Sequence, residues 1–249
     1  MGEHTDGTSR RAFLRVLATT TAGASLTLAH AVGAAPPPPK EGGLSSEGLL
    51  AGQPGFHPRS AAPLPYAELA GFLSRSQLAA HHAEYVAAVE RLKTTEQGLA
   101  SATRDAAAIA AYAELRRQQV ASANDVLLHD FYFTGLAAAK VDVPPYVRRH
   151  MDEHMGSLDS WAADFTMCAS AARAWAALVY DPYDDRWHNT VMDSDVDGVW
   201  VGANPLVVCD VAAHAYGADY QRREEYIAKF LDHIDWDVVA KRYRRVDRM

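Results

Sequence analysis

The chain has 249 residues, of which 49% are hydrophobic and 22% charged, a balance typical of a globular protein with a sizeable core. Its formal net charge of −7 argues against binding to nucleic acid, because phosphate contacts require a basic surface. No apolar run is long enough to span a bilayer, so we expect no stable membrane anchor. Cys168 and Cys209 are too few for a disulfide framework, and we interpret both as core residues, although they could pair with each other.

Residues 1–35 have the layout of an export signal. The twin arginine Arg10-Arg11 is followed by a mildly apolar stretch and then by small residues suited to cleavage. This order predicts export by the twin-arginine route, to the bacterial periplasm or out of the cell. That route carries folded proteins, which hints at a prosthetic group loaded before export. Residues 36–62, rich in proline, glycine and serine, are expected to form a linker.

The next segments predict two helices. Residues 74–93 carry apolar side chains at helical spacing. Residues 101–140 are rich in alanine, which favours a second helix, with a break expected near residues 121–124. Together the two helices predict an N-terminal helical hairpin domain over residues 63–143.

Residues 144–249 mix helical and strand patterns. A helix is expected over residues 157–174, and residues 175–192 predict two strands on either side of an aspartate-rich turn. The apolar run at residues 204–210 predicts a third, buried strand, and helices are expected to follow it. The predicted class is therefore α+β: the helical hairpin domain plus a C-terminal α/β domain with a three-stranded antiparallel sheet.

Histidines and an aspartate on separate elements predict a metal site. Asp210 precedes His214 by one helical turn, so a helix beginning near Asp210 would point both side chains from one face. Alone this pair is a weak signal, since an aspartate at a helix start is usually a cap. His129 lies among leucines and aromatic residues, and the pair His81-His82 lies among alanines. Such features on three elements favour a site built from imidazoles and a carboxylate.

Several segments, taken in order, resemble the iron/manganese superoxide dismutase family over residues 64 to about 243. They are LPY, a helix with His-His, HDFYF, GSLDSWAADF, AWAALVYDP, NPLVVCDVAAHAYGADYQRREEYI and IDWDVVAKRY. The resemblance implies dismutation of superoxide to oxygen and hydrogen peroxide at one Mn or Fe ion per chain. It implies as metal ligands His81, His129, Asp210 and His214. Three imidazoles and one carboxylate suit either metal.

The first helix departs from the family pattern. The family has a gateway tyrosine two helical turns after the first ligand, but Val89 stands there relative to His81, and Tyr85 comes one turn after it. Aligning Tyr85 with the gateway tyrosine would instead put the ligand position on Gln77. We prefer His81 as ligand with Tyr85 as catalytic tyrosine, and the Gln77 register stays an alternative.

Residues around the expected ligands also depart from the family. The family glutamine that hydrogen-bonds the metal-bound solvent aligns with Asp125 or Ser194, and we predict that Asp125 substitutes for it. Ala213 stands where the family has a glutamate that reaches the partner subunit, so a homodimer would have an atypical interface. These departures leave two alternatives: a dismutase-fold metal-binding protein with lost or altered redox activity, and a module with an empty site.

A second pair of histidines lies outside this pattern. His150 and His154 are spaced by one helical turn in a charged segment, with Glu153 beside them. We interpret this segment as the solvated face of a helix, which could at most bind a stray zinc ion.

Overall fold

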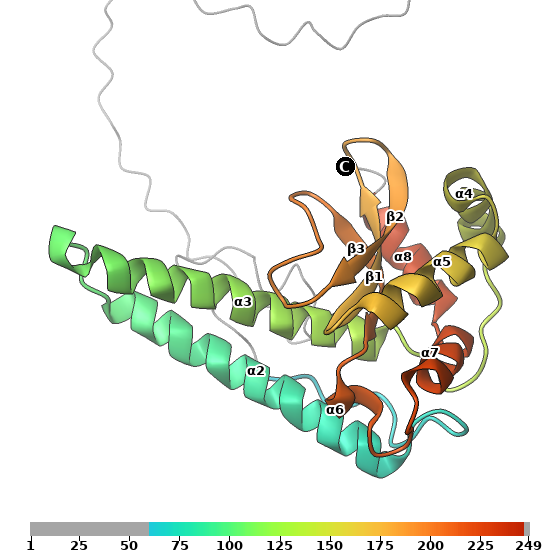
Figure 1. Cartoon of the computed structure of the whole chain (residues 1–249), viewed down its shortest axis with the longest axis horizontal. Coiled ribbons are helices and arrows are strands. Elements are labelled where there is room, and N and C mark those ends of the chain that lie inside the picture. Colours follow the sequence, from blue (N-terminus) through green and yellow to red (C-terminus); the bar gives the residue numbers. More distant parts are fainter. Residues whose placement is uncertain (1–59, 247–249) are drawn as a thin grey trace, which may run out of the picture. The chain divides into compact units, whose positions relative to one another are not determined.

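The computed structural model describes residues 60–246, so the expected export signal at 1–35 and nearly all of the expected linker lie outside the described residues. The described part contains seven α-helices, a short 3-10 helix (Ala106–Ala108) and one three-stranded sheet (Figure 1). Over this part of the chain, none of the helices has the length and hydropathy needed to cross a membrane. The α+β class predicted above is confirmed.

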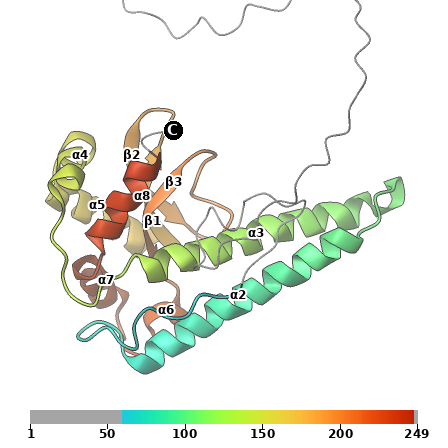
Figure 2. The same cartoon turned by 180° about the vertical axis from the view of Figure 1, so that it is seen from behind.

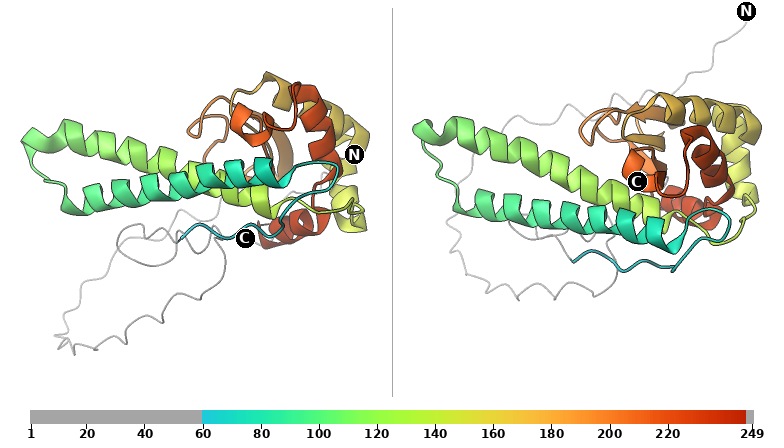
Figure 3. Two further views of the ribbon diagram at one scale, coloured as in Figure 1. Left: turned by 90° about the horizontal axis from the view of Figure 1, so that it is seen from below. Right: turned by 60° about the horizontal axis from the view of Figure 1, so that its bottom comes forward.

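The first two helices form the predicted hairpin. Helix α2 (Arg75–Ser101) and helix α3 (Ile109–Thr134) lie side by side over most of their length (Figures 1 and 3). The predicted break at residues 121–124 is wrong, because no glycine or proline interrupts that stretch and its alanines favour the helix. The predicted extension to residue 140 is also wrong, since α3 ends at Thr134 with Gly135 as its cap.

The sheet has the strand order β2-β1-β3, and both pairings are antiparallel, as expected. Strand β1 (Trp175–Asp181) is central and buried along its whole length, which explains its continuous apolar sequence. Strands β2 (Arg186–Met192) and β3 (Asn204–Asp210) flank it. The turn between β1 and β2 uses the expected aspartates, since Asp181 and Asp184 each accept a hydrogen bond from the backbone N–H two residues later.

Helices from the C-terminal half cover the sheet. Helix α5 (Leu158–Ala171) packs on β1 and β2, helix α4 (Pro145–Met155) on β2, and helix α8 (Trp236–Val246) on β3 (Figure 2). The short helix α6 (Ala213–Tyr216) contacts α2, and α7 (Arg223–Asp232) contacts α5.

One hydrophobic core runs through both halves. It joins side chains of α2 and α3 to those of the sheet and of the helices that cover it. The predicted boundary at residue 143 falls between α3 and α4, in a segment without helix or strand. The position of the metal-site residues follows from this shared core, because α3 contacts β3 while α2 contacts α6. Cys168 and Cys209 are both free thiols.

Candidate metal centre

Four side chains from four elements converge at one point. His81 comes from α2, His129 from α3, Asp210 from the end of β3 and His214 from α6. Each offers one ligand atom, and these atoms all lie within 4.8 Å of one another. A single oxygen, Asp210 Oδ2, lies 2.9 Å from His81 Nε2, 2.9 Å from His214 Nε2 and 4.0 Å from His129 Nε2. The structure thus brings together all four residues that the sequence nominated as ligands.

Three of the four cluster residues have buried side chains. The side chains of His81 and Asp210 are 0% exposed and that of His129 is 2% exposed, whereas His214 is 38% exposed. Burial lowers the pKa of His81, which keeps its imidazole neutral. Burial alone would raise the pKa of Asp210, but hydrogen bonds from His214 and His81 outweigh it and leave the pKa well below the usual range. The cluster therefore offers an ionised carboxylate and imidazoles.

The local chain geometry explains how Asp210 and His214 meet. Asp210 pairs with Trp175 at the end of the β1–β3 ladder, and its Oδ1 accepts a hydrogen bond from Ala212 N at 2.9 Å. This bond turns the chain sharply, so that α6 begins with Ala213 and His214 faces back toward the carboxylate. The backbone oxygen of Asp210 also accepts a hydrogen bond from the buried hydroxyl of Tyr226 at 2.8 Å. Asp210 is thus held at three points.

The register of α2 places His81, and not Gln77, in the cluster. Gln77 is buried one turn earlier, where its amide nitrogen donates to His214 O at 2.6 Å and its amide oxygen accepts from Ala218 N at 2.7 Å. Its side chain therefore ties α2 to the segment that carries His214. The neighbouring His82 points elsewhere, since its Nε2 lies 2.7 Å from the backbone oxygen of Ala62.

His129 is oriented by acceptors behind its ring. Its Nδ1 lies 3.0 Å from Asp125 Oδ1 and 2.9 Å from the backbone oxygen of Asp125. Both atoms are acceptors, so Nδ1 carries the proton and Nε2 keeps its lone pair. That Nε2 is buried and has no hydrogen-bond partner among the described residues. A metal ion is the partner that such a nitrogen fits, and the carboxylate behind it is the usual support for a histidine ligand.

Asp125 is itself held in place. Arg91 Nη2 donates to Asp125 Oδ2 at 2.7 Å, so both carboxylate oxygens have protein partners. Burial raises the pKa of Asp125, but hydrogen bonds from His129 and Arg91 lower it overall. This arrangement makes Asp125 a support for His129, a contact that the sequence did not indicate.

Aromatic rings pack around the imidazoles. The ring of Tyr85 stacks on His129 with centroids 5.9 Å apart, and the ring of Trp175 meets His129 edge-on at 5.0 Å. The hydroxyl of Tyr85 accepts a hydrogen bond from Ala62 N at 3.4 Å, and burial raises its pKa, so the phenol stays protonated. The ring of Tyr85 therefore packs against His129, while its hydroxyl contacts the backbone of Ala62.

A cavity of about 260 Å³ reaches the cluster from outside. Asp210, His129 and His214 are among its lining residues. Its other polar lining residues include Glu84, Arg91, Asp125, Ser194 and Asp195. Arg91 is the one lysine or arginine among the lining residues, and it is already paired with Asp125. The route to the cluster is thus predominantly acidic.

Asp195 is a part of this cavity that sequence reasoning missed. Its Oδ1 accepts a hydrogen bond from Trp175 Nε1 at 2.9 Å, and burial raises its pKa. The acidic stretch at 193–198 marks the segment, but nothing in the sequence says that it folds over the metal cluster.

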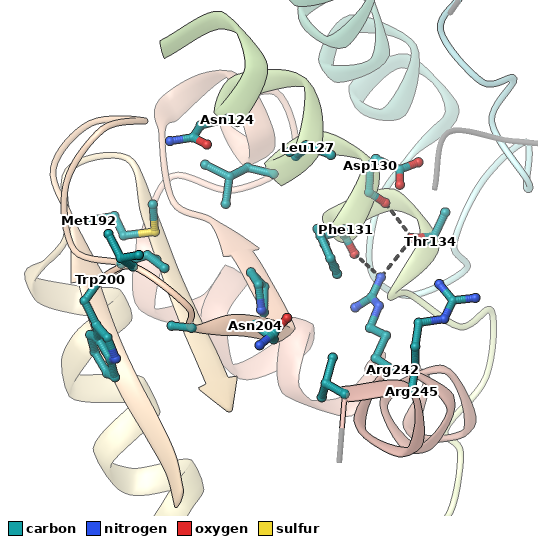
Figure 4. A pocket seen from close by; sticks show the side chains of 16 residues that line it. Asn124, Leu127, Asp130, Phe131, Thr134, Met192, Trp200, Asn204, Arg242 and Arg245 are labelled. Atoms are coloured by element: carbon teal, nitrogen blue, oxygen red, sulfur yellow. Dashed lines mark hydrogen bonds between the residues drawn. The ribbon is translucent and has the colours of Figure 1, made fainter. Parts of the chain in front are cut away.

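A larger cavity of about 570 Å³ lies on another side of α3 and contains none of the four cluster residues. Figure 4 shows its lining, with Met192 and Trp200 across the cavity from Arg242, which is directed at the end of α3. Arg242 donates hydrogen bonds to Phe131 O, Thr134 Oγ1 and Leu206 O, so its guanidinium joins α3, β3 and α8. These bonds give Arg242 a structural role.

The fold and this cluster define a class: an α+β protein with a helical hairpin laid against an α/β unit and a site of three imidazoles and one carboxylate. Comparison with known proteins narrows the class. The profile of the family described as iron/manganese superoxide dismutases, C-terminal domain, matches residues 144–242.

Curated relatives extend the match to the N-terminal helices. The chain is 30% identical over 188 residues to superoxide dismutase [Mn] 2 of Haloferax volcanii, covering 74% of this chain and 94% of that protein. It is 31% identical over 170 residues to superoxide dismutase [Fe] of Aquifex aeolicus, covering 67% and 80%. The chain belongs to the iron/manganese superoxide dismutase family. Relatives named for manganese and for iron match it about equally well.

Proposed function

We propose that the protein is a superoxide dismutase with one Mn or Fe ion held by His81, His129, Asp210 and His214. The observation that carries this proposal is the convergence of three imidazole Nε2 atoms on Asp210 Oδ2, at 2.9, 2.9 and 4.0 Å. When bound, the metal supplies a one-electron couple that takes an electron from one superoxide and returns it, with two protons, to a second. Family membership supports this assignment.

The surrounding residues support the reaction in two ways. Asp125 and Arg91 hold His129 with its Nε2 lone pair directed into the cluster, so the ligand is oriented before metal binds. Tyr85 keeps its phenol proton beside the cluster, since burial raises its pKa. In this proposal Tyr85 acts as the catalytic tyrosine, and Asp125 acts as a positioning residue through His129.

A matched pair of variants on one helix tests the ligand set. His81→Ala should abolish stoichiometric Mn or Fe, measured by metal analysis of the purified protein, and with it superoxide removal. His82→Ala, the adjacent residue with its ring turned to Ala62 O, should keep both. Full metal content in His81→Ala would show that the ligand set is wrong, and metal content without superoxide removal in the parent protein would reject the dismutase activity.

A second candidate is a metal-binding member of the family with lost or altered redox activity. The acidic cavity favours it, because Glu84 and Asp195 would repel an incoming superoxide anion, while the charges of Arg91 and Asp125 offset each other. The two candidates differ in ionic-strength dependence. Turnover that rises with added salt indicates a working dismutase with a repulsive entrance, whereas absent turnover at every salt concentration selects the second candidate.

We also propose export by the twin-arginine route, on the basis of the Arg10-Arg11 pair and the stretch that follows it. Fusion of residues 1–35 to a reporter that is active only after export tests this, and replacing both arginines by lysine should stop it. A homodimer with an atypical interface, proposed from Ala213, is tested by measuring the molar mass in solution.

A further inference from the structure

A second cluster of ligand residues lies on helix α4. His150, Glu153 and His154 occupy one turn of this helix, and one ligand atom of each lies within 4.8 Å of those of the others. His150 Nδ1 lies 3.4 Å from Glu153 Oε2, and the two imidazole centroids are 5.6 Å apart. Spacings of three and four residues place all three side chains on one face of the helix.

This face is not the solvated surface that the sequence indicated. The side chain of His150 is only 15% exposed, and His154 is half-buried. His150 lies edge-on to the rings of Tyr146 and Tyr243, with centroids 4.7 and 4.8 Å away. The earlier interpretation was wrong because α4 packs this face against β2 and α8. Glu153, 55% exposed, keeps the cluster open to solvent on one side.

Hydrogen bonds account for only part of these imidazoles, since the hydroxyl of Tyr243 lies 3.4 Å from His150 Nδ1 but two other ring nitrogens lack partners. Nε2 of His150 and Nδ1 of His154 are both buried, and neither has a hydrogen-bond partner within residues 60–246. A buried histidine that serves only packing normally satisfies its ring nitrogens, because an unpaired buried polar atom is costly. Two neighbouring imidazoles with unsatisfied nitrogens, beside a carboxylate, form a donor set that suits a metal ion.

We propose that His150, Glu153 and His154 form a second metal site, separate from the buried cluster, that binds a divalent transition metal ion of the zinc, nickel or copper type. Imidazole nitrogens are preferred ligands of these ions, whereas Mg²⁺ and Ca²⁺ are bound by oxygen ligands. The exposed side at Glu153 leaves coordination positions for water.

The site is distinct from the proposed dismutase centre. All three of its ligands lie on α4, whereas the buried cluster draws on α2, α3, β3 and α6. Its occupation can therefore be measured in protein that already carries Mn or Fe, and its failure would leave the dismutase proposal untouched.

Titration of the metal-loaded full chain with Zn²⁺ tests this proposal. We expect about one Zn²⁺ per chain beyond the Mn or Fe content, by equilibrium dialysis and metal analysis. The double variant His150→Gln/His154→Gln should lose this zinc, and Glu153→Gln should bind it at least about 10-fold more weakly, since losing a ligand costs no less than losing a residue that supports a ligand. Asp152→Asn, an exposed change on the same helix, should bind zinc as the parent does.

A third group of carboxylates and histidine supplies the matched control. Ligand atoms of Asp181, Asp184 and His188 also lie within 4.8 Å of one another, but His188 is not among the histidines with a buried, unpartnered ring nitrogen. His188→Gln should therefore leave the extra zinc in place. Zinc lost in His188→Gln, zinc retained in the double variant, or no zinc beyond the Mn or Fe content would each overturn the proposal. Unchanged circular dichroism melting in the double variant excludes loss by misfolding.

Quenching of tryptophan fluorescence by Cu²⁺ independently tests where on the protein the metal binds. Trp187 packs edge-on to His154 with centroids 5.7 Å apart, so Cu²⁺ bound at this site should quench its fluorescence. The quenching should vanish in Trp187→Phe and in the double histidine variant. Equal quenching in Trp187→Phe would place the copper elsewhere and contradict the proposal.

Discussion

The two ligand clusters contrast in how the chain builds them. His81 and Asp210 are separated by 129 positions in the sequence, yet their side chains lie 2.9 Å apart at 0% exposure. His150 and Glu153 are three positions apart, so a single helical turn brings them together. The first site therefore requires the complete tertiary fold, whereas the second requires one helix and its packing. Although the two sites have similar ligand atoms, metal binding at the first should therefore depend more strongly on folding than metal binding at the second.

Removal of metal should reveal this difference most strongly. A metal bound to the buried cluster and held at 1,000 times its Kd stabilises the fold by about 4 kcal/mol, or roughly 10 °C in Tm for a chain of this size. Zinc on α4 should raise Tm by much less, because ligands on one helical turn retain affinity for the unfolded chain. Thermal melts of apo, Mn-loaded and Zn-supplemented protein measure both shifts, and equal shifts would remove the contrast.

Gln77→Ala should weaken metal binding at the buried cluster, although Gln77 is not itself a proposed ligand. The change leaves Ala218 N and His214 O without their partner and loosens α6 against α2, at a cost of about 2 kcal/mol. Metal affinity at the buried cluster should fall as well, while zinc on α4 is unaffected. Gln118→Ala on the exposed face of α3 is the control and should change the free energy of unfolding by less than about 0.5 kcal/mol.

Arg91→Met should act on the metal through two residues. Without its guanidinium, Asp125 loses one hydrogen bond and orients His129 less firmly, so metal affinity should fall about 10-fold. Arg117→Met removes a similar but exposed ion pair with Glu114 and should leave metal affinity unchanged. Competition with a chelator measures the metal affinity of each variant. Equal affinities for the two variants would show that Arg91 does not support the metal site through Asp125.

Asp195→Asn should give the smallest effect, seen as a change in pH dependence. Burial raises the pKa of Asp195 above its ordinary value of 3.8, so the folded chain holds this proton more tightly than the unfolded chain. The protonated Asp195 side chain contributes fully to stability at pH values below 3.8, and this contribution is lost as pH rises through the raised pKa. The variant should therefore gain stability relative to the parent, by less than about 1 kcal/mol, as pH rises from about 4 toward neutrality. Urea unfolding of both proteins across this pH range measures the difference in their free energies of unfolding. A difference that stays constant with pH would contradict the prediction.

Local sequence patterns predicted most of the fold. The apolar run of β1, the aspartate-rich turn after it and the strand that ends at Asp210 all lie where expected, because strand burial and turn chemistry are short-range properties. The break predicted in α3 failed because alanine propensity and packing against α2 carry the helix through residues 121–124. The face of α4 was misjudged because the charges nearby gave no sign of the rings of Tyr146 and Tyr243.

The sequence by itself determined the donor types, the order of the elements that carry them and the pairing of Asp210 with His214 across one turn. Only the tertiary structure places His81, and not Gln77, beside Asp210, since both lie on one face of α2 and helical periodicity cannot separate them. The packing of α2 against α6 made Gln77 a bridge to His214 O and brought His81 to Asp210. The support of His129 by Asp125 and Arg91, and the position of Asp195 in the cavity lining, likewise depend on contacts between distant segments.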